Sequence, residues 1–230
     1  IIHSPILTLP PMGCVNVHGS LLPKYRGAAP VQWAVINGET ETGITTMMMD
    51  EGMDTGAMLL QESLPIFPED TAGSLAPRLA ALGGRLLVET IARLKAGTIT
   101  PQPQNHALAT LAPPLKKEDG VIDWATSASS ITNRVRGLSP WPGAYTHIGG
   151  ERWMVWSATQ SPGKPDVVPG TIIEVTKQSI QVATGDGVLA LREIQPSNSK
   201  RLTVAQYLAG HRVSAGQRFD AEPPLSEPPA

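Results

Sequence analysis

The sequence has a single cysteine, Cys14, an aromatic content of only 4%, and no apolar run of membrane-spanning length. One cysteine excludes an internal disulfide and fits a reducing compartment. The net charge is -2, so the chain lacks the overall basic excess that holds a protein on nucleic acid by charge alone. No signal-peptide pattern opens the chain. These absences favour a cytosolic protein without a membrane partner, in which RNA binding would need a local basic patch.

The chain is long enough and apolar enough to fold. Its 230 residues are 41% hydrophobic, which allows one large domain or two modest ones. A stretch rich in Pro, Gln, Thr and Ala, residues 98–118, predicts a linker. We therefore expect a first domain over 1–97, a second over 119–222, and a loose proline-rich tail over 223–230.

The two predicted domains differ in their periodicity. The first mixes β-like and helical patterns, with the strands expected at 13–18, 42–50 and 57–66 and the helices at 30–36 and 71–95. For the longer helix, Thr71 is a suitable N-cap and Gly97 a suitable C-terminal stop. The second domain has one short helix, 127–137, and then several short β-like runs separated by turns, a pattern typical of a small barrel. The expected runs are 144–148, 153–158, 170–175, 179–183 and 188–195.

Three polar residues near the start of the chain have the chemistry of acyl transfer. Asn16 and His18 share one face of the expected strand because strand side chains alternate. Asp54 lies in a tight turn that follows the next strand. A carboxamide can donate to a developing oxyanion, a histidine can move a proton near neutral pH, and a carboxylate can orient the histidine. On spacing alone, a buried structural histidine and a turn-forming asparagine remain equally good interpretations.

Two further features of this region have plainer explanations. Asp50, Glu51 and Asp54 do not have the spacing of a metal site, and the glycines around them indicate a tight turn instead. Cys14 lies in an apolar run and is expected in the core rather than as a nucleophile.

The loop 20–30, with two prolines and small residues, would let backbone groups approach a flat ligand.

Taken together, these motifs resemble the 10-formyltetrahydrofolate-dependent formyltransferases, in the right order and over nearly the whole chain. The second half resembles the C-terminal domain that accompanies the methionyl-tRNA formyltransferases. The matching segments are NVHGSLLP at 16–23, RGAAP at 26–30, TGIT at 42–45, MDTG at 53–56, IDW at 122–124, PWPGA at 140–144 and GDGVL at 185–189.

The resemblance implies an α/β fold, in which a partial Rossmann-like formyltransferase domain is followed by a small OB-like β-barrel. It implies transfer of a formyl group from 10-formyltetrahydrofolate to the α-amino group of methionyl-initiator tRNA, by a monomer that needs no metal. By the same analogy Asn16, His18 and Asp54 are catalytic. The loop Ser20, Leu21, Leu22 and Pro23 contacts tetrahydrofolate, and Lys116 and Lys117 contact tRNA.

One departure from the family pattern concerns the start of the chain. The family domain opens with a nucleotide-binding-like βαβ half, whereas here the richest motif comes within the first twenty residues and residue 1 is Ile1. We therefore expect a missing first half, and we expect the 230-residue chain by itself to be inactive.

Two alternatives stay open. One is a related enzyme that formylates a sugar-nucleotide amine or belongs to a formyltetrahydrofolate hydrolase or dehydrogenase. The other is a non-catalytic RNA-binding barrel. Basic pairs in the second half, such as Lys116 with Lys117 and Lys200 with Arg201, are individually more typical of a solvated surface than of a phosphate-binding patch.

Overall fold

The structure is a computed structural model that describes residues 4–164 and 166–220. The tail expected over 223–230 and the last residues of the expected second domain, 221–222, lie outside the described residues. The chain forms two compact units, Ile1–Leu115 and Lys116–Ala230. Among the described residues, no helix has both the length and the apolar character needed to cross a membrane.

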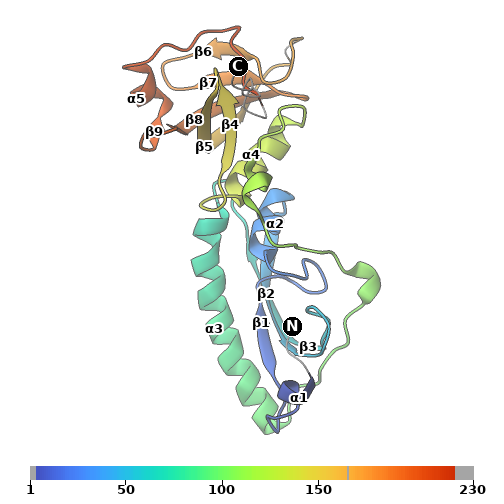
Figure 1. Cartoon of the computed structure of the whole chain (residues 1–230). Coiled ribbons are helices and arrows are strands. Elements are labelled where there is room, and N and C mark those ends of the chain that lie inside the picture. Colours follow the sequence, from blue (N-terminus) through green and yellow to red (C-terminus); the bar gives the residue numbers. More distant parts are fainter. Residues whose placement is uncertain (1–3, 165, 221–230) are drawn as a thin grey trace, which may run out of the picture. The chain divides into compact units, whose positions relative to one another are not determined.

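The first unit is built on a three-stranded antiparallel sheet in the order β1-β2-β3 (Figure 1). Its strands are β1 (Val15–His18), β2 (Glu41–Met48) and β3 (Met58–Pro65). The helices are α1 (Ser4–Leu7), α2 (Pro30–Ile36) and α3 (Ala72–Ala96). Residue pairs in register include His18 with Thr45 and Asn16 with Met47. The α/β fold class expected for this part of the chain is confirmed.

The long helix α3 packs against the sheet and sets which face of β1 is buried. Leu75, Leu79, Leu82 and Leu86 are buried in the core. Gly83 lies so close to β1 that a Cβ there would come within 3.0 Å of Val17 Cγ1. Because Val17 faces α3, its alternating neighbours Asn16 and His18 face the other side of the sheet.

The ends of α3 follow the signals in the sequence. Thr71 is the N-cap: its side chain accepts from the Ser74 N–H, and the Ser74 side chain accepts from the Thr71 N–H. This reciprocal pair satisfies two backbone donors that the helix itself leaves free. At the other end Gly97 adopts the left-handed conformation, φ 64°, which glycine accommodates without strain.

Asp70, just before this helix, ties its start to the chain around it. Its carboxylate accepts from the Phe67 N–H, the Ser74 hydroxyl and Arg78 Nη1 at 2.8, 2.9 and 2.6 Å. Burial favours the neutral acid and is the largest single influence. The three hydrogen bonds and the Arg78 charge together outweigh it and lower the pKa of Asp70.

We expect Asp70→Asn to lower the free energy of unfolding by about 1.5–3 kcal/mol at pH 7, because a charged hydrogen-bonding centre is lost. A carboxyl whose folded pKa is depressed stabilises the protein above its unfolded pKa of about 4, and this contribution disappears as pH falls through the folded pKa. Urea unfolding at pH 7 and pH 3 should therefore show a smaller difference between the two proteins at pH 3. The adjacent exposed acid offers the control Glu69→Gln, which should have little effect. An equal loss at both pH values would contradict this account.

The second unit contains a sheet in the order β4-β5-β8-β7-β6, with β9 paired to β8. The strands are β4 (Ala144–Ile148), β5 (Glu151–Ser161), β6 (Ile172–Val175), β7 (Ile180–Ala183), β8 (Val188–Pro196) and β9 (Leu202–Thr203). The helices are α4 (Ala128–Gly137) and α5 (Val204–Leu208), and a 3-10 turn, η2 (Lys117–Gly120), opens the unit.

One irregular segment near residue 219 joins the two edges of this sheet. The Phe219 N–H donates to Gly170 O and the Ile172 N–H donates to Gln217 O, which attaches the segment at the β6 edge. Asp220 exchanges two backbone hydrogen bonds with His147 of β4 at the opposite edge. Since both edges are bridged by the same segment, the sheet closes into the small barrel that the sequence predicts.

The motifs that mark the second half of the sequence have structural roles in this barrel. Trp124 is buried, stacks on Phe219 with ring centroids 5.5 Å apart, and donates from its indole N–H to Thr146. Gly185 lies so close to Ala125 that a Cβ would come within 1.8 Å of the Ala125 carbonyl oxygen. Through these contacts, the segment just before α4 packs against the strands of the barrel.

Candidate active site

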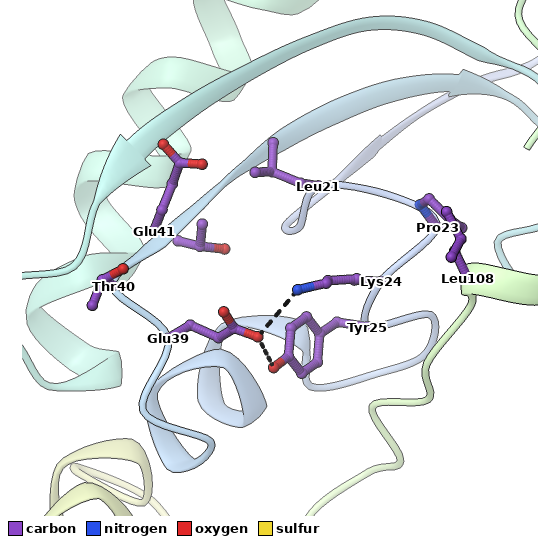
Figure 2. A pocket seen from close by; sticks show the side chains of 9 residues that line it. Leu21, Pro23, Lys24, Tyr25, Glu39, Thr40, Glu41 and Leu108 are labelled. Carbon is purple, nitrogen blue, oxygen red and sulfur yellow. Dashed lines mark hydrogen bonds and ion pairs between the residues drawn. The ribbon is translucent and has the colours of Figure 1, made fainter. Parts of the chain in front are cut away.

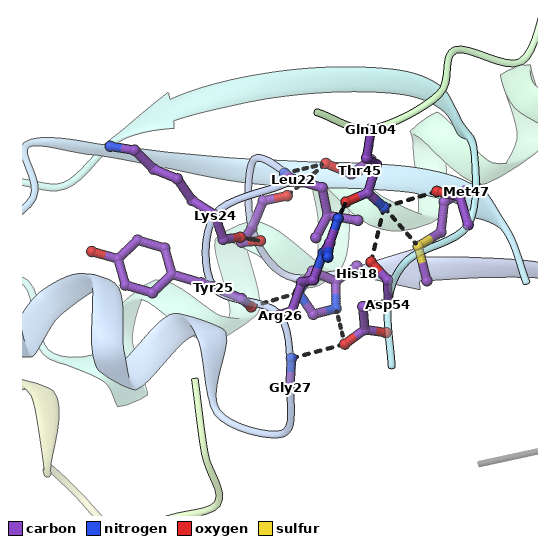
Figure 3. A network of polar contacts seen from close by, with 12 residues as sticks. His18, Leu22, Lys24, Tyr25, Arg26, Gly27, Thr45, Met47, Asp54 and Gln104 are labelled. Atoms are coloured by element: carbon purple, nitrogen blue, oxygen red, sulfur yellow. Dashed lines mark hydrogen bonds and ion pairs between the residues drawn. The ribbon is translucent and has the colours of Figure 1, made fainter. Parts of the chain in front are cut away.

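His18 lies at the end of β1 and is almost entirely buried. Its Nε2 is 2.9 Å from the carbonyl oxygen of Tyr25, and its Nδ1 is 3.5 Å from Asp54 Oδ2 (Figure 3). A backbone carbonyl only accepts hydrogen bonds, so Nε2 carries a proton in this arrangement. Nδ1 is therefore the nitrogen left to exchange a proton with a reactant, and Asp54 is the group that faces it.

Asp54 lies in the turn between β2 and β3 and has a positive φ of 54°, an uncommon conformation outside glycine. Its side chain is only 16% exposed. Besides facing His18, its Oδ2 accepts the Gly27 N–H at 2.8 Å. The carboxylate is thus held between an imidazole and a backbone donor, an orientation suited to a group that steers a histidine.

Gln104 and Arg26 hold the backbone of the same turn. The Gln104 side-chain amide donates to the carbonyl oxygens of Asp54 and Gly56, both at 2.8 Å. Its own oxygen accepts from Arg26 Nε and Nη2 at 3.0 and 2.5 Å. Both side chains are buried. Figure 3 shows this network running beside His18 and Asp54.

Asn16 lies two residues before His18 on β1, with its side chain on the same face, and it is half-buried. Among the residues that the structure describes, its side-chain amide has no hydrogen-bonding partner. The structure brings His18 and Asp54 into contact and leaves the Asn16 amide free to bind a third group on that face. An amide donor, a histidine and a carboxylate on one surface can stabilise an oxyanion and move a proton.

Two side chains of the sheet hold the backbone of the loop Ser20–Pro23 by hydrogen bonds. Thr45 Oγ1 donates to Ser20 O at 2.7 Å and accepts the Leu22 N–H at 3.0 Å. Gln61 Nε2 donates to Leu22 O at 2.8 Å. Ser20 and Leu22 are buried, so the loop has a fixed shape on the sheet.

Leu21 and Pro23 point the other way, into a pocket of about 500 Å³ (Figure 2). The Tyr25 ring also lines this pocket, while its backbone carbonyl contacts His18. The pKa of Tyr25 is raised to about 12: burial is the main cause, and Glu39 adds to it against an opposing hydrogen bond from Asn37. Tyr25 is therefore a neutral hydroxyl at physiological pH and not a base.

The remaining residues singled out in the sequence are two lysines and the cysteine. Lys116 and Lys117 are both exposed at the start of the second unit, Lys117 as the first residue of η2. Cys14 is half-buried, and its thiol lies 3.9 Å from Leu7 O. Within the described residues, no group of three or more His, Cys, Asp or Glu side chains is placed to hold a metal ion.

Gln104 lies in the stretch predicted to be a linker, so its residue type does not mark it as part of a site. In the structure this stretch is hydrogen-bonded to the sheet, for example through reciprocal backbone bonds between Gln102 and Met58. The contacts of Tyr25 and Gly27 are made by backbone atoms. A backbone donor or acceptor has no signature in the residue type. Gln104 follows Pro103 and precedes Asn105, and nothing in that run marks it as a buried residue.

Family models match both units of the chain. The model described as formyl transferase matches residues 1–91, and the model described as formyl transferase, C-terminal domain, matches residues 114–212. Among curated proteins, the methionyl-tRNA formyltransferase of Desulfotalea psychrophila is 49% identical over 94% of this chain and 67% of the relative. That of Solibacter usitatus is 48% identical over 95% of this chain and 70% of the relative.

Solved structures of formyltransferases also match the chain. The methionyl-tRNA formyltransferase from Clostridium thermocellum matches with a TM-score of 0.51 and 26% identity, over 66% of this chain and 65% of its own. An N-formyltransferase from Helicobacter canadensis, solved with folinic acid and dTDP-3-aminofucose, matches with a TM-score of 0.63 over 82% of this chain and 66% of its own. At 21% identity, that second match shows the fold alone. The chain belongs to the formyl transferase family, among its methionyl-tRNA formyltransferases.

Proposed function

We propose that the protein transfers a formyl group from 10-formyltetrahydrofolate to the α-amino group of methionyl-initiator tRNA. The observation that carries the chemistry is the pairing of His18 Nδ1 with Asp54 Oδ2 on the face of β1 that also presents Asn16. The assignment of the acceptor is supported by the near 50% identity to methionyl-tRNA formyltransferases over almost the whole chain.

The reaction needs an oxyanion donor and a proton carrier. The neutral amine attacks the formyl carbon, a new C–N bond forms, and the carbonyl electron pair moves to oxygen. We assign the stabilisation of this oxyanion to the free Asn16 amide. When the intermediate collapses, the bond to the folate N10 breaks, and N10 takes up a proton in place of the formyl group.

The proton lost by the attacking amine has to reach that leaving nitrogen. His18 can carry it through Nδ1, because Nε2 is already bound to the Tyr25 carbonyl. Asp54 keeps the imidazole in place and stabilises its cationic form, directly or across a bridging water. No covalent intermediate with the enzyme and no metal is required in this sequence of steps.

Contacts with the donor are assigned to the loop Ser20, Leu21, Leu22 and Pro23. Leu21 and Pro23 offer apolar surface to the folate, while the anchored backbone at Ser20 and Leu22 keeps that surface rigid. A rigid apolar wall is well suited to a flat aromatic ligand.

Contacts with tRNA are assigned to Lys116 and Lys117, whose exposure leaves both ammonium groups available to phosphates. We also propose that the enzyme is a monomer. It would act in the cytosol, because charged initiator tRNA is found in the compartment of translation.

The acceptor distinguishes this proposal from its alternatives. The protein as its gene encodes it should formylate methionyl-initiator tRNA and leave an amino sugar nucleotide unmodified, with radiolabelled formyl donor as the readout. Transfer to the sugar nucleotide, or donor hydrolysis that is independent of tRNA, would contradict the proposal. So would binding of tRNA without any turnover of the donor.

A further inference from the structure

The turn that carries Asp54 depends on a residue outside it. Asp54 has a left-handed backbone, and Gly56 is packed so closely that a Cβ there would meet Met48 O at 1.8 Å. A turn of this kind persists where the surrounding structure holds it. Here Gln104 supplies that support, by donating to the carbonyl oxygens on either side of Thr55.

The chemistry of the site accepts a side-chain amide in one orientation only. Both amide hydrogens face carbonyl oxygens, and the amide oxygen faces the guanidinium of Arg26. A flipped amide would place its oxygen against two acceptors and its hydrogens against a cation. A glutamate would satisfy Arg26 but has no hydrogen to give to Asp54 O or Gly56 O.

Arg26 completes a closed ring of contacts around the candidate active site. Its guanidinium is buried and, among the described residues, pairs with no carboxylate; Gln104 is its side-chain partner. The next residue, Gly27, donates its N–H to Asp54 Oδ2. The ring therefore fixes both the backbone and the carboxylate of Asp54 relative to the loop that follows His18.

We propose that Gln104 is a positioning residue for formyl transfer, which holds the Asp54 carboxylate against His18 Nδ1 with Arg26 as its anchor. The inference rests on the proposed function, because it assigns Gln104 a role only through Asp54. It touches no reactant, so its effect should fall on the chemical step and not on the binding of either substrate.

The first test compares Gln104→Leu with Gln102→Leu, the same change two residues earlier at an exposed position. We expect Gln104→Leu to lower kcat by about 10- to 100-fold with KM for both substrates within about twofold, because a small misplacement of a catalytic group costs this much. Gln102→Leu should leave both constants unchanged. Near wild-type kcat in Gln104→Leu, or a loss that appears only in KM, would overturn the proposal.

Gln104→Glu keeps the size of the side chain and its contact with Arg26, which guards against simple loss of folding. We expect it to remain folded at the assay temperature, with some loss of thermal stability, and still to lose about tenfold or more in kcat, since both donors to the turn are gone. Wild-type kcat in this variant would overturn the proposal. Gln102→Glu is the matched control for the added charge.

A double-mutant cycle with Asp54→Asn separates this inference from the proposed function. If Gln104 acts through Asp54, adding Gln104→Leu to Asp54→Asn should lower kcat by no more than about twofold further. A further loss as large as in the wild-type background would show a general structural effect and overturn the inference. If Asp54→Asn alone has wild-type kcat, the assignment of Asp54 fails instead, and with it the basis for this role.

Discussion

Replacing Asp54 by asparagine is expected to lower kcat by about 10²–10⁴-fold, because His18 loses the carboxylate that orients it for proton transfer, a function typically worth that factor. The variant loses the negative charge that faces His18 Nδ1 at 3.5 Å. It keeps the shape of the side chain and an oxygen that can accept the Gly27 N–H. Asparagine also tolerates the left-handed backbone of this position. Single-turnover formyl transfer measures the chemical step directly.

Stability should change little in this variant, by less than about 1 kcal/mol, since the packing and the turn are retained. Glu51→Gln is a matched control: it makes the same acid-to-amide change at an exposed position of the same turn and should have normal kcat. If Asp54→Asn formylates at nearly the wild-type rate, Asp54 has no catalytic role. If it unfolds instead, the residue is structural.

Removing the Asn16 amide is expected to lower kcat by about 10²–10³-fold, the usual cost of losing one oxyanion donor. Asn16 has no hydrogen-bonding partner among the described residues, so its loss leaves no buried group unsatisfied. Asn16→Ala should therefore cost less than about 1 kcal/mol in stability. Steady-state kinetics and urea unfolding on the same preparation give both quantities.

The isosteric variant Asn16→Asp provides the second arm of this test. It keeps the shape of the side chain but replaces the donor by an acceptor, next to the position where negative charge would develop. We expect it to be at least as slow as Asn16→Ala. Wild-type kcat in either variant would mean that the oxyanion is stabilised elsewhere and that the free amide of Asn16 has another purpose.

The sequence predicts the elements of this protein better than the details of its site. Pro30–Ile36 is a helix, as its proline start and Asn37–Gly38 stop predict. Ala144–Ile148 is a strand between turn residues, also as predicted. Such elements depend on local signals that are written in the residue types. The closure of the barrel by residues 217–220 depends on backbone bonds between distant segments and has no such signal.

The same distinction applies within the site. His18 and Asp54 could be singled out because imidazole and carboxylate have recognisable chemistry. The contacts that orient them come from the Tyr25 carbonyl, the Gly27 N–H and Gln104. Two of these are backbone atoms, which any residue would supply. The third lies in a stretch whose composition is typical of a linker, and only the fold brings it under the turn.

A crystal structure of the protein with a stable analogue of 10-formyltetrahydrofolate would show whether Asn16, His18 and Asp54 surround the reacting group. The formyl oxygen should lie within about 3 Å of the Asn16 amide nitrogen, the distance of an oxyanion hydrogen bond. His18 Nδ1 and Asp54 should then border the attacked carbon on the same face of β1. A formyl group bound away from these three side chains would show that they are not the catalytic residues.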